Sequence, residues 1–247
     1  MSALLEVDGL TKRFGGLVAV KSVSFTLEPG EITGILGPNG AGKTTLFNLL
    51  TGFIATDAGT ATFVGRSLIG LAPHRVVNLG LARTFQLCRP FRGMSVLENV
   101  SVGCLAPRVR HEGHAAARAR RILAQVGLEA KAEVPVDVLP YGDLRRLEIA
   151  RALATRPTLL LLDEPFAGLG SNEIEPLSAL IRKLHAEEGL TILIIEHKLR
   201  EFMQLVRRVI AMDFGEVIAI GPPAEIVRHP RVVEAYIGRT EAPLGVA

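Results

Sequence analysis

The chain has 247 residues, 48% hydrophobic and 21% charged, with 25 Gly and 14 Pro, so it can bury a sizeable core as one large domain or two small ones. This composition excludes a disordered chain and a fibrous repeat. The formal net charge of +3 is spread along the chain without a basic block or tail, which gives no support for nucleic acid as a partner.

The amino-terminal segment carries Glu6 and Asp8 where a signal peptide requires an apolar core. No uncharged apolar run approaches the ~18 residues of a membrane span. We therefore expect neither a signal peptide nor a transmembrane segment, and a cytoplasmic protein. The two cysteines, Cys88 and Cys104, have no metal-ligating neighbours and make no framework of paired bridges, so we expect reduced thiols.

Short β-branched segments open the chain, at residues 4–7, 18–20 and 23–27. Glycines separate the first two, and a Pro-Gly pair follows the last, as is typical of strands joined by tight turns. These segments predict an antiparallel sheet at the edge of the domain.

Three uncharged apolar runs follow, at Ile32–Leu36, at residues 158–162 and at Thr191–Ile195. Such runs are typical of central strands in a parallel sheet that helices cover on both faces. A further strand is expected at residues 81–85. The long stretch from residue 85 to residue 156 is predicted to be mostly helical.

Several arginines surround an Ala-rich segment of this helical stretch. No aromatic residues interleave with them to stack on bases, so the pattern favours a solvated helix face over a nucleic-acid patch. The residues concerned are Arg108, Arg110, Arg118, Arg120 and Arg121.

The run Ile32–Leu36 leads directly into the pattern G-x-x-x-x-G-K-T, which is followed by the start of an amphipathic helix. Glycines let successive backbone N–H groups face phosphate oxygens, and the helix N-terminus adds a partial positive charge. Lys43 is expected to reach the β- and γ-phosphates, and the Thr44 hydroxyl to ligate Mg²⁺. The predicted nucleotide-binding loop comprises Gly37, Pro38, Asn39, Gly40, Ala41, Gly42, Lys43, Thr44 and Thr45.

Two acids, Asp163 and Glu164, come directly after the run at 158–162. Ligands of open α/β sheets bind at the carboxyl ends of the strands, so these carboxylates should lie beside the phosphate loop. We expect Asp163 to hold Mg²⁺, directly or through water, and Glu164 to act as the general base that polarises the attacking water.

Two further side chains follow strands at the same sheet edge. His197 comes shortly after Thr191–Ile195 and could donate to the γ-phosphate, although a lone histidine in this place is often a surface or capping residue. Gln86 follows the strand at 81–85, and its amide could reach the metal ion and the attacking water.

The chain resembles the ATP-binding-cassette ATPase family over about residues 4–237. The resemblance rests on five motifs in the order of that family: the phosphate loop, Gln86, a glycine-containing helix start, Asp163-Glu164 and His197. The resemblance implies an α/β P-loop NTPase core with a mainly parallel sheet, an N-terminal antiparallel β subdomain and a helical signature subdomain. It implies one ATPase domain at 4–238, with the core at 4–85 and 157–238 and the helical subdomain at about 86–156. We expect residues 239–247 to be a tail after this domain.

Where the family has a Leu-Ser-Gly-Gly-Gln signature, this chain has Leu-Pro-Tyr-Gly-Asp at 139–143, and Pro140 offers neither a hydroxyl nor an N–H. The helix start with Tyr141, Gly142 and Asp143 could still receive phosphate of a nucleotide held by the partner subunit. Gly170 stands where the family usually has an aspartate that contacts the opposite subunit, and Ser171 or Asn172 would be its substitute.

By the same resemblance, the reaction is ATP hydrolysis with ATP and Mg²⁺, and the catalytic residues are Lys43, Glu164 and His197. Metal ligands are Thr44, Gln86 and Asp163. Phe14 corresponds to the aromatic residue that stacks on adenine, with a core phenylalanine as the alternative. Two chains, identical or merely related, would pair head to tail and enclose two ATP molecules.

Several segments resemble the ATPase subunits of branched-chain amino acid importers, namely Tyr141-Gly142 and residues 83–86, 145–153 and 229–238. This implies membrane permease subunits that dock near residues 86–98, a periplasmic solute-binding protein as an indirect partner, and a peripheral place on the cytoplasmic face of the inner membrane. Lipopolysaccharide-export ATPases and urea or amide importers are also similar.

Other classes are less consistent with the chain. Members of the family that act in translation carry two cassettes, and those that act in DNA repair carry long coiled-coil insertions. Neither arrangement fits 247 residues. A kinase or GTPase would lack this order of motifs, and a GTPase needs an Asn-Lys-x-Asp base reader that is absent. A catalytically inactive module is disfavoured because Lys43, Asp163, Glu164 and His197 are all present.

Overall fold

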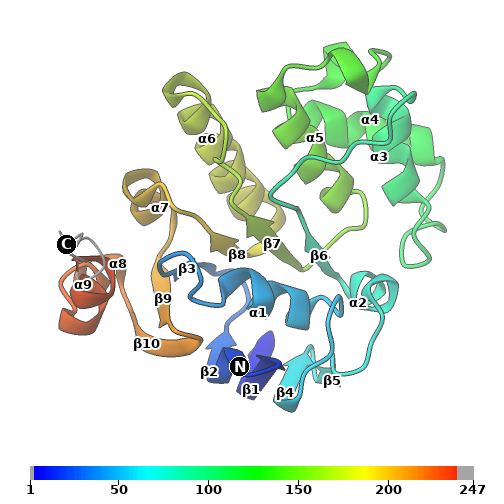
Figure 1. Ribbon diagram of the computed structural model, residues 1–247. Coiled ribbons are helices and arrows are strands. Elements are labelled where there is room, and N and C mark those ends of the chain that lie inside the picture. The colour runs from blue at the N-terminus through cyan, green and yellow to red at the C-terminus, as the bar shows by residue number, and fades with distance from the viewer. Residues whose placement is uncertain (1–2, 238–247) are drawn as a thin grey trace.

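The computed structural model describes residues 3–237, and its first strands form an antiparallel sheet in the order β2-β1-β4-β5 (Figure 1). β1 (Leu5–Phe14) and β2 (Leu17–Leu27) pair from Leu5 opposite Leu27 to Phe14 opposite Leu17. The predicted antiparallel sheet is confirmed, but the segments at 18–20 and 23–27 are one strand. Ser22 adopts a φ of 49° between them, so β2 kinks there and continues.

The other two strands of this sheet are β4 (Ala58–Phe63) and the short β5 (Arg66–Ser67), which pair antiparallel. β4 also pairs with β1, so that β1 is a central strand. Neither β4 nor β5 was expected from the sequence, because β5 has only two residues and the first three of the six residues of β4 are exposed.

A second, six-stranded sheet has the order β10-β9-β3-β8-β7-β6. Its strands are parallel except for the edge strand β10, which runs antiparallel to β9. The predicted mainly parallel sheet is therefore confirmed. The strands are β3 (Ile32–Leu36), β6 (Leu81–Arg83), β7 (Leu159–Asp163), β8 (Thr191–Ile195), β9 (Arg208–Asp213) and β10 (Glu216–Gly221).

Two of these strands differ in extent from the expectation. β6 ends at Arg83 and not at Phe85, because the chain turns away from β7 after Thr84 N donates to the Leu161 carbonyl. β7 is displaced by one residue from 158–162 and ends on Asp163, which pairs with Ile195 of β8.

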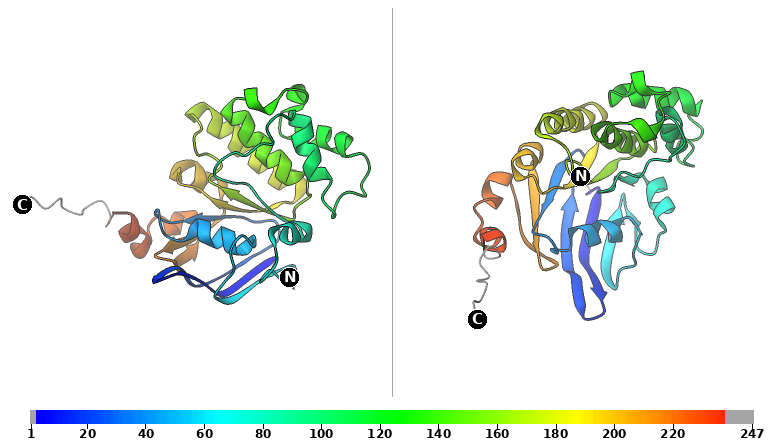
Figure 2. Two further views of the ribbon diagram at one scale, coloured as in Figure 1. Left: turned by 45° about the vertical axis from the view of Figure 1, so that its right-hand side comes forward. Right: turned by 45° about the horizontal axis from the view of Figure 1, so that its top comes forward.

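Alternate residues of the parallel sheet enter two different hydrophobic cores. Leu159 and Leu161 of β7 join the core that contains Phe47 of α1 (Lys43–Leu50), whereas Leu160 and Leu162 join the core on the opposite face. The first face is covered by α1 and the antiparallel sheet, and the second by helices (Figures 1 and 2). Helices therefore lie on both faces of the parallel sheet, as expected, and the antiparallel sheet covers part of one face as well.

The segment between β6 and β7 is mostly helical, as predicted, and its helices lie together on one side of the parallel sheet (Figure 1). One of its arginines differs from the expectation of a solvated face. Arg118 is 6% exposed, and its guanidinium donates to the carbonyls of Cys104 and Val109. The elements are α3 (Val96–Cys104), α4 (Ala115–Gln125), the short 3₁₀ turns Glu129–Lys131 and Val136–Val138, and α5 (Tyr141–Leu153).

The remaining helices are α2 (Pro73–Leu79), α6 (Ser171–Glu188), α7 (Leu199–Leu205), α8 (Pro223–Ile226) and α9 (Pro230–Ile237). Within residues 3–237, no helix is long and apolar enough to cross a membrane. Cys88 and Cys104 are both free thiols, as expected. The predicted tail at 239–247 and the domain end at 238 lie outside the described residues.

Candidate functional site

The carboxyl ends of four neighbouring parallel strands gather the polar residues that the sequence singled out. β3 leads into the phosphate loop, β6 toward Gln86, β7 into Asp163 and Glu164, and β8 toward His197. Since parallel strands end at the same sheet edge, residues that lie up to 160 positions apart meet at one place.

The phosphate loop between β3 and α1 depends on glycine at more than one position. Gly42, at the N-terminus of α1, has a φ of 98°, and no side chain of the described residues caps this helix end. The first-turn amides of α1 are therefore available to an anion, as the sequence predicted. Gly37 lies so close to β9 that a Cβ atom would clash with the backbone oxygen of Met212.

Lys43 lies across this loop with only 5% of its surface exposed. Its Nζ donates to the carbonyl oxygens of Gly37 at 2.6 Å and of Pro38 at 2.9 Å. The ammonium group is thus held above the loop backbone by neutral acceptors, which a phosphate can replace as a stronger, charged partner.

Asp163 forms a buried ion pair with Arg83, whose Nη2 lies 2.6 Å from Oδ2, with side-chain exposures of 5% for Arg83 and 3% for Asp163. Burial raises the pKa of Asp163 above its ordinary value, and Arg83 opposes this rise. The other carboxylate oxygen, Oδ1, is buried and has no hydrogen-bond partner among the described residues. One oxygen of Asp163 is therefore fixed by an arginine while the other is left for a ligand.

These residues fit a magnesium ion. An unpartnered buried carboxylate oxygen is a suitable ligand for Mg²⁺, and Thr44 in the first turn of α1 adds a hydroxyl. Within residues 3–237, no three His, Cys, Asp or Glu side chains cluster to hold a metal ion. The donor set therefore suits an ion that takes its other ligands from phosphates and water.

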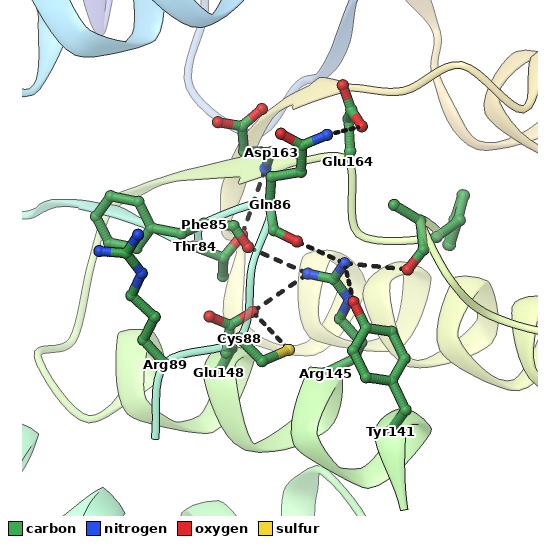
Figure 3. A network of polar contacts seen from close by, with 12 residues as sticks. Thr84, Phe85, Gln86, Cys88, Arg89, Tyr141, Arg145, Glu148, Asp163 and Glu164 are labelled. Carbon is green, nitrogen blue, oxygen red and sulfur yellow. Dashed lines mark hydrogen bonds and ion pairs between the residues drawn. The ribbon is translucent and has the colours of Figure 1, made fainter. Parts of the chain in front are cut away.

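Glu164 receives two side-chain hydrogen bonds, one at each carboxylate oxygen. His197 Nε2 lies 2.7 Å from Oε1 and donates to it in the tautomer that carries the proton on this nitrogen, and Gln86 Nε2 donates to Oε2 at 2.7 Å (Figure 3 shows Gln86 and Glu164). Glu164 adopts a φ of 48°, an uncommon value for a non-glycine residue, and its backbone N–H donates to the Ile195 carbonyl. The structure thus brings Gln86, Glu164 and His197 together, as expected.

The signature segment begins α5, with Pro140 as the N-cap and no capping side chain among the described residues. Tyr141, Gly142 and Asp143 form the first turn. Asp143 pairs with Lys131, and a Cβ atom on Gly142 would lie 2.5 Å from Glu173 Oε1. The carboxylate of Asp143 is therefore engaged within the chain, while no side chain of residues 3–237 caps the amides of this turn, and the Asp143 N–H donates to the Pro140 carbonyl.

Two further predicted positions lie at the surface. Phe14 is 49% exposed at the end of β1, with Lys12 Nζ 5.5 Å from the ring centroid, so it is not a core phenylalanine. Gly170 is the N-cap of α6, and its N–H donates to Glu173 Oε2 at 3.0 Å. Ser171 and Asn172, the possible substitutes for a carboxylate at 170, are both exposed.

Sequence reasoning missed four charged residues that support the site. Glu196 is 2% exposed and accepts from the backbone N–H groups of Phe166 and His197, which ties the ends of β7 and β8 together. Arg83, Arg145 and Glu148 stood out in the sequence only as parts of the segments that resemble importer ATPases. Their burial was the missing signal, because it depends on contacts with distant parts of the chain.

Residues 20–167 match the family described as ABC transporter, and residues 216–242 match the family described as branched-chain amino acid ATP-binding cassette transporter. The chain is 43% identical to the high-affinity branched-chain amino acid transport ATP-binding protein LivG of Salmonella typhimurium, over 95% of this chain and 98% of that protein. It is 37% identical to the lipopolysaccharide export system ATP-binding protein LptB of Acidithiobacillus ferridurans, over 96% and 98%.

Among solved structures, the ADP conformation of MJ1267, an ATP-binding cassette of an ABC transporter, matches with a TM-score of 0.88 and 31% identity, covering 96% of this chain and 100% of that chain. The expected fold is therefore confirmed by a solved cassette as well as by the strand order. This chain belongs to the ABC transporter family and is one of its ATP-hydrolysing, ATP-binding subunits.

Proposed function

We propose that this chain energises the import of branched-chain amino acids, and that the hydrogen-bonded Glu164 carries its ATPase chemistry. The 43% identity to LivG exceeds the 37% identity to LptB, and the match of residues 216–242 to the branched-chain family supports the same solute class. A urea or amide importer and a lipopolysaccharide exporter are the alternatives.

In this proposal the phosphate loop binds the triphosphate of ATP. Lys43 exchanges its two carbonyl partners for phosphate oxygens, and the first-turn amides of α1 donate to the same group. Thr44 and Asp163 would hold Mg²⁺, with Gln86 near it. When bound, this ion would offset phosphate charge.

Glu164 is the general base that accepts a proton from the attacking water. Its two hydrogen bonds, from Gln86 and His197, hold the carboxylate in one orientation at the end of β7. His197 can leave this bond to donate to the γ-phosphate, which would couple the presence of that phosphate to the freedom of Glu164. This pair of hydrogen bonds is the observation that carries the proposed chemistry.

Two chains would enclose ATP between the phosphate loop of one and the first turn of α5 of the other, where Tyr141, Gly142 and Asp143 lie. The partner would be an identical or a related ATPase subunit. Phe14, exposed at 49%, would stack on adenine.

Permease subunits would dock on residues 86–98. Leu87, Phe91 and the preceding Phe85 are 65%, 41% and 38% exposed, and three large exposed apolar side chains within one short segment suit an apolar partner surface. A cavity of about 200 Å³ adjoins Phe85 and Phe91. Docking there would place the chain on the cytoplasmic face of the inner membrane, with a periplasmic binding protein as an indirect partner.

The test of the proposed chemistry is Glu164→Gln, which keeps the size of the side chain but removes the base. ATP binding should remain, turnover should fall by ~10² or more, and an ATP-bound dimer should accumulate. Glu175→Gln is a matched control, because Glu175 is exposed on α6 and pairs with the exposed Arg182. A Glu164→Gln variant with normal turnover would place the base elsewhere.

The solute is tested with the complex of this chain and its permeases in lipid vesicles. Stimulation of ATP hydrolysis by leucine-loaded binding protein, and not by a urea-loaded one, would support the proposal. Genes for two permeases and a periplasmic binding protein beside this one would also favour import, whereas lipopolysaccharide-dependent turnover would favour the exporter.

A further inference from the structure

Arg145, on α5, joins three parts of the chain through one buried guanidinium group (Figure 3). Its side chain is only 3% exposed. Nη1 donates to the carbonyl oxygen of Phe85 at 3.1 Å, and Nη2 donates to those of Gln86 at 2.8 Å and Ala167 at 3.0 Å. α5 is thereby connected both to the segment after β6 and to the loop that follows Glu164.

Neighbours on α5 fix the orientation of this guanidinium. Arg145 Nη2 donates to the Tyr141 hydroxyl at 2.7 Å, and the guanidinium lies 5.0 Å from the centroid of the Tyr141 ring. Glu148 Oε2 lies 3.4 Å from Nη1 and balances its charge. The guanidinium group can serve this many acceptors at once because it is planar and carries several N–H donors, and a lysine ammonium group cannot reproduce this arrangement.

The residue whose backbone carbonyl Arg145 holds is the same Gln86 whose side chain donates to Glu164. We propose that Arg145 is a positioning residue for ATP hydrolysis: it fixes the Gln86 segment and the loop after Glu164 in the one arrangement in which this amide meets this carboxylate. The inference rests on the proposed role of Glu164 as general base.

The aromatic residue in the signature segment supports the same arrangement. Gly168, in the loop after Glu164, has a φ of 79°, and a Cβ atom there would lie 2.7 Å from Tyr141 Cε1. The Tyr141 ring therefore packs on this loop while its hydroxyl accepts from Arg145. Position 141 acts within its own chain, in addition to any contact with a nucleotide of the partner subunit.

Measuring kcat and KM separately distinguishes a positioning role of Arg145 from a role in nucleotide binding. In the full-length protein, Arg145→Ala should lower kcat at least about tenfold while KM for MgATP changes less than about twofold. Arg145→Lys should recover part of the loss, and Tyr141→Phe, which removes one acceptor and keeps the ring, should lower kcat by a smaller factor. Arg120→Ala is the control, because Arg120 forms an exposed ion pair with Glu133, and its kcat should match that of the unchanged protein.

A double-mutant cycle with Gln86→Ala tests whether Arg145 acts through Gln86. Arg145→Ala should reduce kcat by less than about twofold in the Gln86→Ala background, because the contact that it positions is already gone. Circular dichroism and the stoichiometry of a fluorescent ATP analogue report the folded fraction. If Arg145→Ala does not fold, the same cycle is run with Arg145→Lys and Tyr141→Phe.

Equal losses in both backgrounds, or a rise in KM at constant kcat, would overturn the inference. The result is separable from the proposed chemistry. Normal turnover of Glu164→Gln would refute the role of Glu164 itself, whereas a slow Glu164→Gln variant together with a normal Arg145→Ala variant would refute only the positioning role.

Discussion

The ion pair between Arg83 and Asp163 gives the sharpest prediction of stability. Both side chains are almost completely buried, and Arg83 also donates to Asn48 Oδ1 at 2.7 Å while its guanidinium stacks on Phe47 and Phe85. Arg83→Met keeps much of the packing volume but leaves Asp163 as a buried carboxylate without its cation. Breaking a buried pair in this way typically costs about 3–5 kcal/mol of unfolding free energy at neutral pH.

This loss should depend on pH with a definite sign. Burial already raises the pKa of Asp163 above the value of an exposed carboxyl, and without Arg83 nothing of comparable strength opposes that rise. The folded variant then binds a proton that the unfolded chain releases, so its stability relative to the parent protein increases as the pH falls. The destabilisation measured at pH 7 should therefore shrink at about pH 5.

The assay is urea unfolding at both pH values, followed by far-ultraviolet circular dichroism because the chain contains no Trp. Arg182→Met is the control: its pair with Glu175 is exposed, so it should cost less than about 1 kcal/mol at either pH. A loss for Arg83→Met below about 1 kcal/mol, or one that does not change between the two pH values, would refute the assigned role of this pair.

Three further outcomes follow from the site. Lys43→Ala should weaken ATP binding at least about tenfold and abolish measurable turnover, because the variant loses the buried ammonium group that would pair with the phosphates. Lys183 is exposed on α6, so Lys183→Ala should change neither quantity. Normal hydrolysis by Lys43→Ala would contradict the phosphate-loop assignment. Pro140→Ser should alter turnover by less than about threefold, because no side chain of the described residues caps the first turn of α5, and in the proposed dimer its helix N-terminus would already attract the partner's phosphate without the hydroxyl. A large gain would mean that the native signature is impaired. Burial raises the pKa of Cys88 to about 12, so at pH 8 the thiolate fraction of Cys88 is ~10³ lower than that of an ordinary thiol. Iodoacetamide should therefore modify Cys88 far more slowly in the native protein than in urea. In the native protein this rate should rise with pH beyond pH 10. Equal rates in the two states would show that Cys88 is not protected.

The amino-acid sequence by itself determined the phosphate loop and the acids at the end of β7. Gly37 to Thr44, Asp163 and His197 each sit at or near the end of a buried apolar run, and both the run and its polar end are local features of the chain. The same local reasoning predicted Ile32–Leu36 and Thr191–Ile195 with their observed bounds.

The tertiary structure alone decided which charges are buried and which side chains meet. Arg83 and Asp163 are 80 residues apart, and Arg145 lies 60 residues from Phe85, so no periodicity or spacing relates them. Arg118 was expected at a solvated face for the same reason, since an arginine in an Ala-rich helix gives no sign of the carbonyls that surround it. The strength of a charge in a protein depends on its distance from water and on its partners, and both are fixed only when distant segments pack.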